Sequence, residues 1–347
     1  MLGQPQVDEL ARRFGLGGGA RLTGLVERGE QGQIVQLATD RGMWAVKMAF
    51  EGFESEMDGE DAAFQTAARE AGVPAPAVVR TTAGEAFADV AGAVVRVYEW
   101  VDIRPADRTL DPEAVGALIG AMHRVGFAGR RPEHPWYTDR VGAAGWDGLV
   151  AELEAAGAPF AADMAALRDD LVAVEAFIEP AETLRTCHRD LWADNIRAAG
   201  GGGLCVIDWE NCGLADPGQE LSGVLFEFWL GDPDRARALD RAYRSAGGPG
   251  RVDHRGSFAM TIAQLGHITE ISCRHWLDPA TTEDERRRQV GRVAECTEGP
   301  LTVEVIDAIL DAIRDLLGRR QLGHAIASAA MTACRPAVSM PAPVHGS

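Results

Sequence analysis

Hydrophobic and polar positions alternate in short runs through the first hundred residues, and this period of two indicates β-strands. The runs cover residues 21–27, 33–39, 43–48, 77–81 and 93–98. Between the third and fourth runs, residues 54–71 are rich in Glu and Ala, which predicts a helix that the Gly and Pro residues of 72–76 bring to an end. We therefore expect a small antiparallel sheet with one main helix.

Beyond residue 101 the hydrophobic positions recur at helical spacing instead. The Asp111-Pro112-Glu113 sequence supplies an N-cap, a proline in the first turn and an early acid, so it predicts a helix start. Helices are expected over residues 111–123, 164–178, 218–230, 234–246, 256–276, 283–296 and 302–318. The pattern divides the chain into a small lobe at residues 1–101, a mostly helical lobe at 102–320, and a tail at 321–347 whose proline and serine content predicts disorder.

The composition excludes several classes of function. A net charge of −18 argues against a nucleic-acid partner, because phosphate binding needs a basic surface, whereas the same charge could attract a cationic small molecule. No apolar run has the length of a membrane span, and residues 1–15 lack the basic-then-apolar pattern of a signal peptide. Scattered cysteines without a CxxC pair are typical of free thiols in a reducing compartment. We expect a cytoplasmic protein, either a monomer or a homodimer, that does not bind membranes.

The chain contains a single lysine. Of its 34 basic residues, Lys47 is the one ammonium group and all the others are arginines. Lys47 lies in the third predicted strand, among apolar residues. A lysine is a compact point charge whereas an arginine presents a planar fork, so the two are not interchangeable in a tight site. The position of this one lysine therefore indicates a functional role.

Three oxygen-bearing side chains lie close together in the sequence of the helical lobe. Asp190 is predicted to lie in a loop, Asn195 follows five residues later, and Asp208 ends the apolar strand at 204–207. Four consecutive glycines between them predict a tight turn, which would bring Asn195 and Asp208 together in an antiparallel hairpin. Phosphoryl transfer needs a group that orients the attacking hydroxyl and oxygen ligands for Mg²⁺. Asp190 suits the first role, and Asn195 and Asp208 suit the second.

Lys47 could contact the phosphates of a nucleotide if a carboxylate held its flexible side chain. Two candidates lie in the helix that follows: Glu60 is the first choice and Glu56 the second. Gly29 and Gly32 lie in the turn between the first two strands, where the missing side chains would let the backbone approach the phosphates. These residues are expected to form the nucleotide side of the site.

Six short sequence motifs follow one another between residues 22 and 225. They are Trp44-Ala45-Val46-Lys47, Gly72-Val73-Pro74-Ala75-Pro76, Leu118–Arg124, His188-x-Asp190-x4-Asn195, Val206-Ile207-Asp208-Trp209-Glu210 and Ala215-Asp216-Pro217-x-x-Glu220-Leu221. This set resembles the aminoglycoside phosphotransferase and choline kinase-like family, which shares the bilobal fold of protein kinases. The resemblance implies an α+β fold with a nucleotide-binding small lobe and a catalytic, substrate-binding large lobe.

The resemblance also implies a role for each position noted above. Asp190 would be the catalytic residue, and Asn195 and Asp208 would be the Mg²⁺ ligands. Lys47 would contact the α- and β-phosphates. The hinge on which adenine docks would be formed by Glu99, Trp100 and Val101.

Several positions stay open. Asp208 is followed by Trp209-Glu210 rather than Phe-Gly, which argues against a protein kinase. Asp194 could compete as a metal ligand, and Glu210 could either reach the metal or cap the turn. His188 is expected to orient the loop through hydrogen bonds rather than to act in catalysis.

We therefore predict an enzyme that transfers the γ-phosphate of ATP (or GTP) to a hydroxyl of a small molecule, with Mg²⁺. An aminoglycoside or other antibiotic is the leading acceptor class, and such an enzyme would confer antibiotic resistance. The alternatives are a kinase of a non-antibiotic metabolite, such as an amino alcohol or sugar, and a catalytically silent nucleotide-binding module. Polar residues of the later helices that could line the acceptor pocket are Asp253, His254, Gln264, His267, Glu270 and His275.

Overall fold

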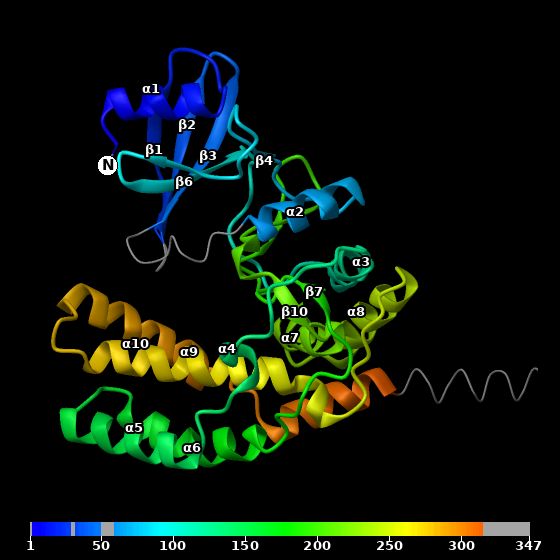
Figure 1. Ribbon diagram of the computed structural model, residues 1–347. Helices are drawn as coiled ribbons and strands as arrows, with labels where there is room; N and C mark the ends of the chain where they lie inside the picture. The colour runs from blue at the N-terminus through cyan, green and yellow to red at the C-terminus, as the bar shows by residue number, and fades with distance from the viewer. Residues whose placement is uncertain (1, 29–31, 50–58, 315–347) are drawn as a thin grey trace, which may run out of the picture.

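The computed structural model describes residues 2–28, 32–49 and 59–314. A small sheet and a larger helical part make up the described chain, and the segment after residue 99 connects them (Figure 1). Gly29, Glu56 and the predicted tail at 321–347 lie outside the described residues. Within the described chain, no helix combines the length and the apolar character that a membrane span requires.

The sheet is antiparallel throughout, as the alternating runs predict. Its strands lie in the order β1 (Arg21–Arg28), β2 (Gly32–Thr39), β3 (Gly42–Ala49), β6 (Ala93–Glu99) and β4 (Val78–Val79), and β5 (Ala88–Val90) also pairs with β6. Lys47 of β3 lies opposite Ile34 on β2 and opposite Arg96 on β6. The lysine therefore sits on a strand that is paired on both sides, which fixes its position.

The first helix, α1 (Gln4–Arg13), covers the sheet (Figure 1). Val7 and Leu10 of this helix are buried in one cluster with Val35 of β2 and Val97 of β6. Phe14, just after the helix, joins the same cluster. Because these helix positions lie three or four residues apart, they form one apolar stripe that faces the strands.

The helix α2 (Glu60–Glu70) packs on the helical part of the molecule. The ring of Phe64 lies 5.3 Å from that of Trp209 and 5.4 Å from that of Phe127, measured between centroids. A buried ion pair links the same helix to the sheet, between Asp61 in its first turn and Arg96 of β6. The helix thus connects the two parts of the molecule, with its apolar face on one and a carboxylate bonded to the other.

The helical part consists of α3 (Pro112–His123), α4 (Pro135–Thr138), α5 (Ala143–Ala156), α6 (Ala161–Glu175), α7 (Pro217–Trp229), α8 (Pro233–Ser245), α9 (Ala259–Leu277), α10 (Glu283–Glu298) and a helix over residues 303–314. Two short antiparallel pairs lie among these helices: β7 (Arg185–Cys187) with β10 (Gly213–Ala215), and β8 (Ile196–Ala198) with β9 (Leu204–Val206). The sequence pattern predicts most of these helices, but it does not predict α4 or α5.

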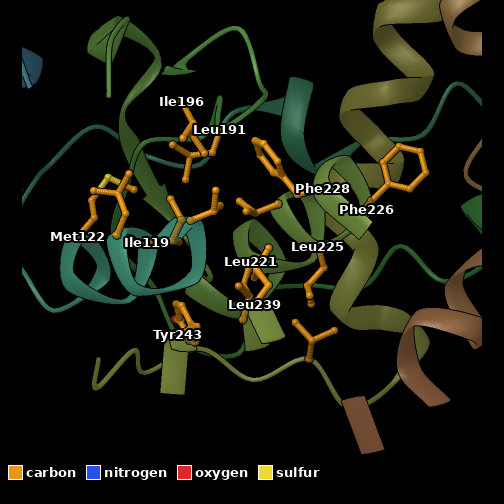
Figure 2. Packing of buried hydrophobic residues seen from close by; sticks show 14 of the residues in the cluster. Ile119, Met122, Leu191, Ile196, Leu221, Leu225, Phe226, Phe228, Leu239 and Tyr243 are labelled. Atoms are coloured by element: carbon orange, nitrogen blue, oxygen red, sulfur yellow. The ribbon is translucent and has the colours of Figure 1, made fainter. Parts of the chain in front are cut away.

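The loop that carries Asp190 is anchored in the hydrophobic core. Leu191 and Ile196, which flank the loop residues 192–195, are buried with Ile119 of α3 and Leu221 of α7 (Figure 2). Both anchors lie next to a polar candidate, since Leu191 follows Asp190 and Ile196 follows Asn195. The core therefore fixes the backbone from which these two polar side chains project.

Candidate active site

Three amide side chains hold the carboxylate of Asp190. Its Oδ2 accepts hydrogen bonds from Nδ2 of Asn195 at 3.0 Å and from Nδ2 of Asn211 at 3.1 Å. Nε2 of Gln264 lies 3.4 Å from its Oδ1. Burial raises the pKa of Asp190, and the amide donors of Asn211 and Asn195 oppose that shift because they stabilise the charged form. The result is a fixed carboxylate that can accept a proton from a bound hydroxyl.

The β8–β9 hairpin brings Asn195 and Asp208 together, as predicted. Ile196 pairs with Val206, and the backbone N–H of Ile207 donates to the Asn195 carbonyl oxygen at 3.0 Å. The glycines of the turn make this tight connection possible, because two of them adopt positive φ angles that other residues avoid. Asn195 and Asp208 therefore leave the same end of the hairpin.

His188 braces the backbone next to Asp208, as expected from the sequence. Its Nε2 lies 3.0 Å from the carbonyl oxygen of Ile207. Asp208 itself adopts a left-handed conformation, with φ of 60°, which costs free energy in a residue other than glycine. Burial lowers the pKa of His188, so the neutral ring can donate from Nε2 to this carbonyl. The histidine thus stabilises a strained backbone.

Lys47 reaches from the sheet to two carboxylates of the helical part. Its Nζ lies 2.6 Å from Oδ1 of Asp208 and 3.0 Å from Oε2 of Glu210. The hydroxyl of Tyr98, on β6, donates to Oε1 of Glu210 at 3.0 Å. The cluster therefore joins residues that are far apart in the chain: Lys47 and Asp208 are separated by 161 positions.

The charges of this cluster shift one another's pKa values. Burial opposes the charge of Lys47, but Glu210 and Asp208 outweigh it and raise the pKa of the ammonium. Burial likewise opposes ionisation of Glu210, but Lys47 holds the pKa of this carboxyl well below its usual range. For Asp208, burial and the neighbouring charge of Glu210 raise the pKa well above its usual range. The positive charge of Lys47 thus stabilises the ionised form of Glu210 more than that of Asp208.

The structure corrects the expected partner of Lys47. Oε1 of Glu60 accepts hydrogen bonds from the backbone N–H groups of Arg130 at 2.8 Å and Arg131 at 2.9 Å. The ion pairs of Lys47 are formed with Asp208 and Glu210 instead. The reason is the packing of α2, which places its first turn against residues 129–131. The alternative partner, Glu56, lies outside the described residues.

The donor set fits a divalent metal ion. Asn195 uses its Nδ2 protons on Asp190, which leaves its Oδ1 as an uncharged oxygen ligand. Asp208 and Glu210 contribute carboxylates, and Asp194 is exposed to solvent. Such oxygen ligands are the ones that Mg²⁺ prefers. A divalent cation would also offset the negative charge that raises the pKa of Asp208.

The positions predicted to bind the nucleotide, at the hinge and in the glycine turn, also make contacts within the protein itself. Trp100 donates its backbone N–H to Met43 at 3.4 Å, and Glu99 donates to Ala77 at 2.9 Å. The N–H of Val101 bonds to no group in the described part of the chain. Gly32 pairs with β3, where a Cβ would collide with the Met48 carbonyl oxygen, so strand packing alone requires this glycine. The other predicted position of that turn, Gly29, lies outside the described residues.

Glu220 of α7 holds the backbone of the Asp190 loop from behind. Its carboxylate accepts hydrogen bonds from the backbone N–H groups of His188, at 3.4 Å, and Arg189. Its Oε2 also lies 2.6 Å from Nε2 of His123, and His123 Nδ1 lies 2.9 Å from the Tyr243 hydroxyl. Burial opposes ionisation of Glu220, but these contacts lower the pKa of its carboxyl. The network gives the loop a charged, hydrogen-bonded support.

Arg189 ties the loop to the segment that follows Asp208. Its guanidinium donates to the carbonyl oxygens of Asn211 at 2.6 Å, Pro132 at 3.0 Å and Cys212 at 3.2 Å. It also lies over the ring of Tyr137, 4.7 Å from the centroid. These contacts position the backbone of Asn211, whose side chain in turn binds Asp190. The sequence motifs do not single out Asn211, although it lies only three residues after Asp208.

Of the residues predicted to line an acceptor pocket, one contacts Asp190 and the others have different partners or positions. Gln264 of α9 hydrogen-bonds Asp190. His267, one turn later, stacks on Trp136 of α4, with ring centroids 5.4 Å apart and planes inclined by 22°. Glu270 is paired with Arg274 at 2.9 Å. His254 forms ion pairs with Glu179 and with its neighbour Asp253, which is also a candidate. The last candidate, His275, is exposed.

A family model for a phosphotransferase enzyme family matches residues 25–256 of the chain. No curated protein matches the chain by sequence. The range of the family match contains Lys47, Asp190, Asn195, Asp208 and Glu210, whereas Gln264 lies beyond its end.

Solved structures of similar fold include a spectinomycin phosphotransferase in complex with ADP and spectinomycin. It has a TM-score of 0.63 and 13% identity, over 90% of this chain and 98% of the other. An amicoumacin kinase in complex with AMP-PNP and Ca²⁺ has a TM-score of 0.60 and 13% identity, over 86% and 94%. An aminoglycoside phosphotransferase from Alicyclobacillus acidocaldarius has a TM-score of 0.57 and 14% identity, over 92% and 97%. At these identities the similarity shows a shared protein kinase-like fold.

Proposed function

Because this chain belongs to the phosphotransferase enzyme family, we propose that it transfers the γ-phosphate of ATP or GTP to a hydroxyl of a small molecule. The observation that carries this proposal is the contact between Lys47 of the sheet and the carboxylates of Asp208 and Glu210, at 2.6 Å and 3.0 Å. In the proposed reaction this contact would join the cation that binds the phosphates to the carboxylates that bind the metal, and Asp190 would supply the third group. A phosphotransferase needs these three groups at one place.

Each residue of the cluster has one role in the proposed reaction. Asp190 orients the acceptor hydroxyl and takes its proton as the new O–P bond forms. Asn195 and Asp208 hold Mg²⁺, with Glu210 beside them, and the bound ion would neutralise charge that develops on the phosphate oxygens. Lys47 contacts the α- and β-phosphates, where its position between the two lobes fits a cation shared by nucleotide and carboxylates.

The nucleotide base is proposed to dock on the segment Glu99, Trp100 and Val101. The backbone N–H of Val101, which bonds to no group in the described chain, offers a donor to the edge of adenine. The neighbouring residues are held by Ala77 and Met43, so this donor has a fixed position. Glu60, by contrast, is engaged with the backbone of Arg130 and Arg131, and we assign it no direct role in nucleotide binding.

The acceptor is proposed to be an antibiotic, and an aminoglycoside is the first class to test. Structures of similar fold include enzymes named for spectinomycin, amicoumacin and aminoglycosides. The net charge of −18 would favour a cationic acceptor, because it raises the local concentration of cations near the protein. An amino alcohol or a sugar is a second acceptor class for the same chemistry.

The direct test is a screen for acceptor-dependent production of ADP or GDP. The full chain is incubated with Mg²⁺ and ATP or GTP, and with aminoglycosides, spectinomycin, amicoumacin, choline, ethanolamine and simple sugars in separate reactions. We expect at least one acceptor to stimulate turnover and to gain one phosphoryl group by mass spectrometry. Asp190→Asn should lower that turnover by about 10²–10⁴-fold with little change in nucleotide affinity. A chain that binds nucleotide but phosphorylates nothing in the panel would contradict the proposal.

A further inference from the structure

We infer that Gln264 of α9 is a positioning residue for Asp190, one that fixes the direction of the carboxylate toward the acceptor hydroxyl. The inference rests on the proposed function, because it assigns Gln264 a task in that reaction. Its basis is a pair of contacts: Nε2 of Gln264 lies 3.4 Å from Oδ1 of Asp190 and 3.3 Å from the carbonyl oxygen of Arg189.

The side-chain amide of Gln264 can have only one orientation here. Its Nε2 carries two protons, which match the two oxygens it faces. If the amide were turned over, its oxygen would face a carbonyl oxygen and a carboxylate oxygen, and all three would repel one another. The glutamine therefore donates to Arg189 and Asp190 at the same time. Both distances exceed the roughly 2.9 Å that is usual for such bonds, so each bond is individually weak.

The two oxygens of Asp190 are held from different sides. Oδ2 accepts from Asn195 and Asn211, which belong to the nucleotide side of the site: Asn211 follows Asp208 closely in the chain, and the β8–β9 hairpin brings Asn195 back to the strand before Asp208. Oδ1 accepts from Gln264 alone among the described residues. The last torsion of an aspartate is soft and turns both carboxylate oxygens together, so a donor on Oδ1 restricts the carboxylate plane further than the donors on Oδ2 do by themselves. Gln264 thus supplies the third contact that holds the carboxylate plane, and the direction of the Oδ1 electron pairs follows from that plane.

Gln264 also supports the strained peptide that precedes Asp190. Arg189 has φ of 65°, a left-handed conformation that costs free energy outside glycine. Its N–H is held by Glu220 and its carbonyl oxygen by Gln264. The two helices α7 and α9 thereby hold the same residue from its two ends, and a change at either end would alter the direction of Asp190.

The helix α9 is well placed to transmit the presence of an acceptor to Asp190. Gln264 is 5% exposed, so the surrounding packing fixes its rotamer. One turn later on the same helix, His267 stacks on Trp136 and forms an aromatic surface. An acceptor that docks on this surface would contact the helix that also carries Gln264. The geometry therefore joins acceptor binding and the orientation of Asp190 in one rigid element.

The step itself leaves Gln264 chemically unchanged. The acceptor oxygen forms a bond to the γ-phosphorus as the bond from that phosphorus to the bridging oxygen of the nucleotide breaks. The electron pair of the broken bond stays on the departing ADP, and the proton of the acceptor hydroxyl passes to Oδ1 of Asp190. Gln264 only keeps Oδ1 directed at that proton throughout.

The test is a double-mutant cycle on ATP turnover. The full chain, Gln264→Met, Asp190→Asn and the double variant are compared with Mg²⁺-ATP, with spectinomycin as one acceptor and with water alone as the other. We expect Gln264→Met to lower kcat by about tenfold and to leave the KM for ATP within about twofold, since a small misplacement of a reacting group has effects of this size. In the Asp190→Asn background the same change should have almost no effect.

Two further variants keep the test informative. Thr261→Val removes a buried hydroxyl of the same helix that faces Ser222 at 3.0 Å instead of Asp190, and kcat should stay at the wild-type value. Gln264→Glu preserves the size of the side chain, and it should be slower than Gln264→Met because a second carboxylate would repel Asp190. Thermal unfolding of each variant shows whether it is folded, and Gln264→Glu replaces Gln264→Met if the latter is not.

The possible outcomes separate this inference from the proposed function. If Gln264→Met slows the Asp190→Asn variant by the same factor as the wild-type chain, Gln264 acts on stability in general and the inference is wrong. An unchanged kcat in Gln264→Met, with Asp190→Asn still impaired, also overturns it. If Asp190→Asn turns over ATP as fast as the wild type, or if the wild type turns over ATP with neither spectinomycin nor any other acceptor of the panel above, the proposed function fails first.

Discussion

Glu220 Oε2 lies 2.6 Å from Nε2 of His123, and both side chains are fully buried behind the loop that carries Asp190. The same carboxylate accepts hydrogen bonds from the backbone of His188 and Arg189. A single acid on α7 therefore connects α3 to the loop that carries Asp190. The conformation of that loop therefore depends on a buried carboxylate.

Removal of this acid should destabilise the fold. We expect Glu220→Ala to lower the free energy of unfolding by about 3–5 kcal/mol, because the backbone donors and His123 lose their partner in a buried place. Urea denaturation measures the change. The matched control is Glu113→Gln, since Glu113 pairs with Arg241 on the surface and should contribute about 1 kcal/mol or less. Equal losses in the two variants would contradict the structural role of Glu220.

The charge and shape of Lys47 should both be required for nucleotide use. We expect Lys47→Met to raise the KM for ATP and to lower kcat, since it removes the cation between the phosphates and Asp208. Lys47→Arg should not restore activity, because the planar guanidinium does not fit a site built for a point charge. Steady-state kinetics with Mg²⁺-ATP measures both effects. Arg80→Lys, an exposed change on the sheet side, is the control, and full activity of Lys47→Arg would refute the argument from shape.

Breaking the buried ion pair between Arg96 and Asp61 should lower the free energy of unfolding, whereas replacing both residues by apolar ones should change it little. Asp61→Ala leaves an unpaired guanidinium and should lower the free energy of unfolding by about 3–5 kcal/mol. The pair is imperfectly satisfied, because Oδ1 of Asp61 and Nε of Arg96 have no hydrogen-bond partner among the residues that the structure describes. The double change Arg96→Met and Asp61→Leu should therefore recover most of the loss. A double variant no more stable than Asp61→Ala would show that the ion pair itself is needed.

His188 should make the protein less stable in mild acid. Burial lowers the pKa of this histidine in the folded chain, whereas the unfolded chain has the ordinary value of about 6.5. Below that pH the unfolded state binds a proton that the folded state does not, so the free energy of unfolding falls as the pH decreases from 7 to 5. His188→Gln should flatten this dependence, as measured by urea denaturation at several pH values. Parallel curves for the two proteins would rule out the assignment.

Features that depend on neighbouring residues could be predicted from the sequence. The pairing of Asn195 with the strand before Asp208 follows from apolar runs joined by glycines, and the structure confirms the hairpin. The antiparallel sheet with Lys47 on its third strand follows from alternation in the same way. Such elements are determined by backbone geometry over a few residues, which the order of amino acids records directly.

Contacts between distant segments could not be predicted in this way. Glu60 was the expected partner of Lys47 because it lies in the helix that follows, yet the packing of Phe64 on Trp209 directs the start of α2 toward residues 130–131. Lys47 instead pairs with Asp208 and Glu210, which meet it only because the helical part packs against the sheet. The helix α5 was missed for a different reason, because its glycines weaken the helical signal even though Trp146 and Leu153 are buried at helical spacing.

Lys47 is the only lysine of the chain, and its ammonium lies where the sheet meets the carboxylates of the helical part. Protein grown on nitrogen-15-labelled lysine would therefore carry one labelled side-chain ammonium in the whole molecule. Its magnetic resonance signal would need no assignment by mutagenesis, and it would report directly on whether the two lobes are together or apart. The amino-acid composition has thus placed an intrinsic probe of domain motion at the centre of the site.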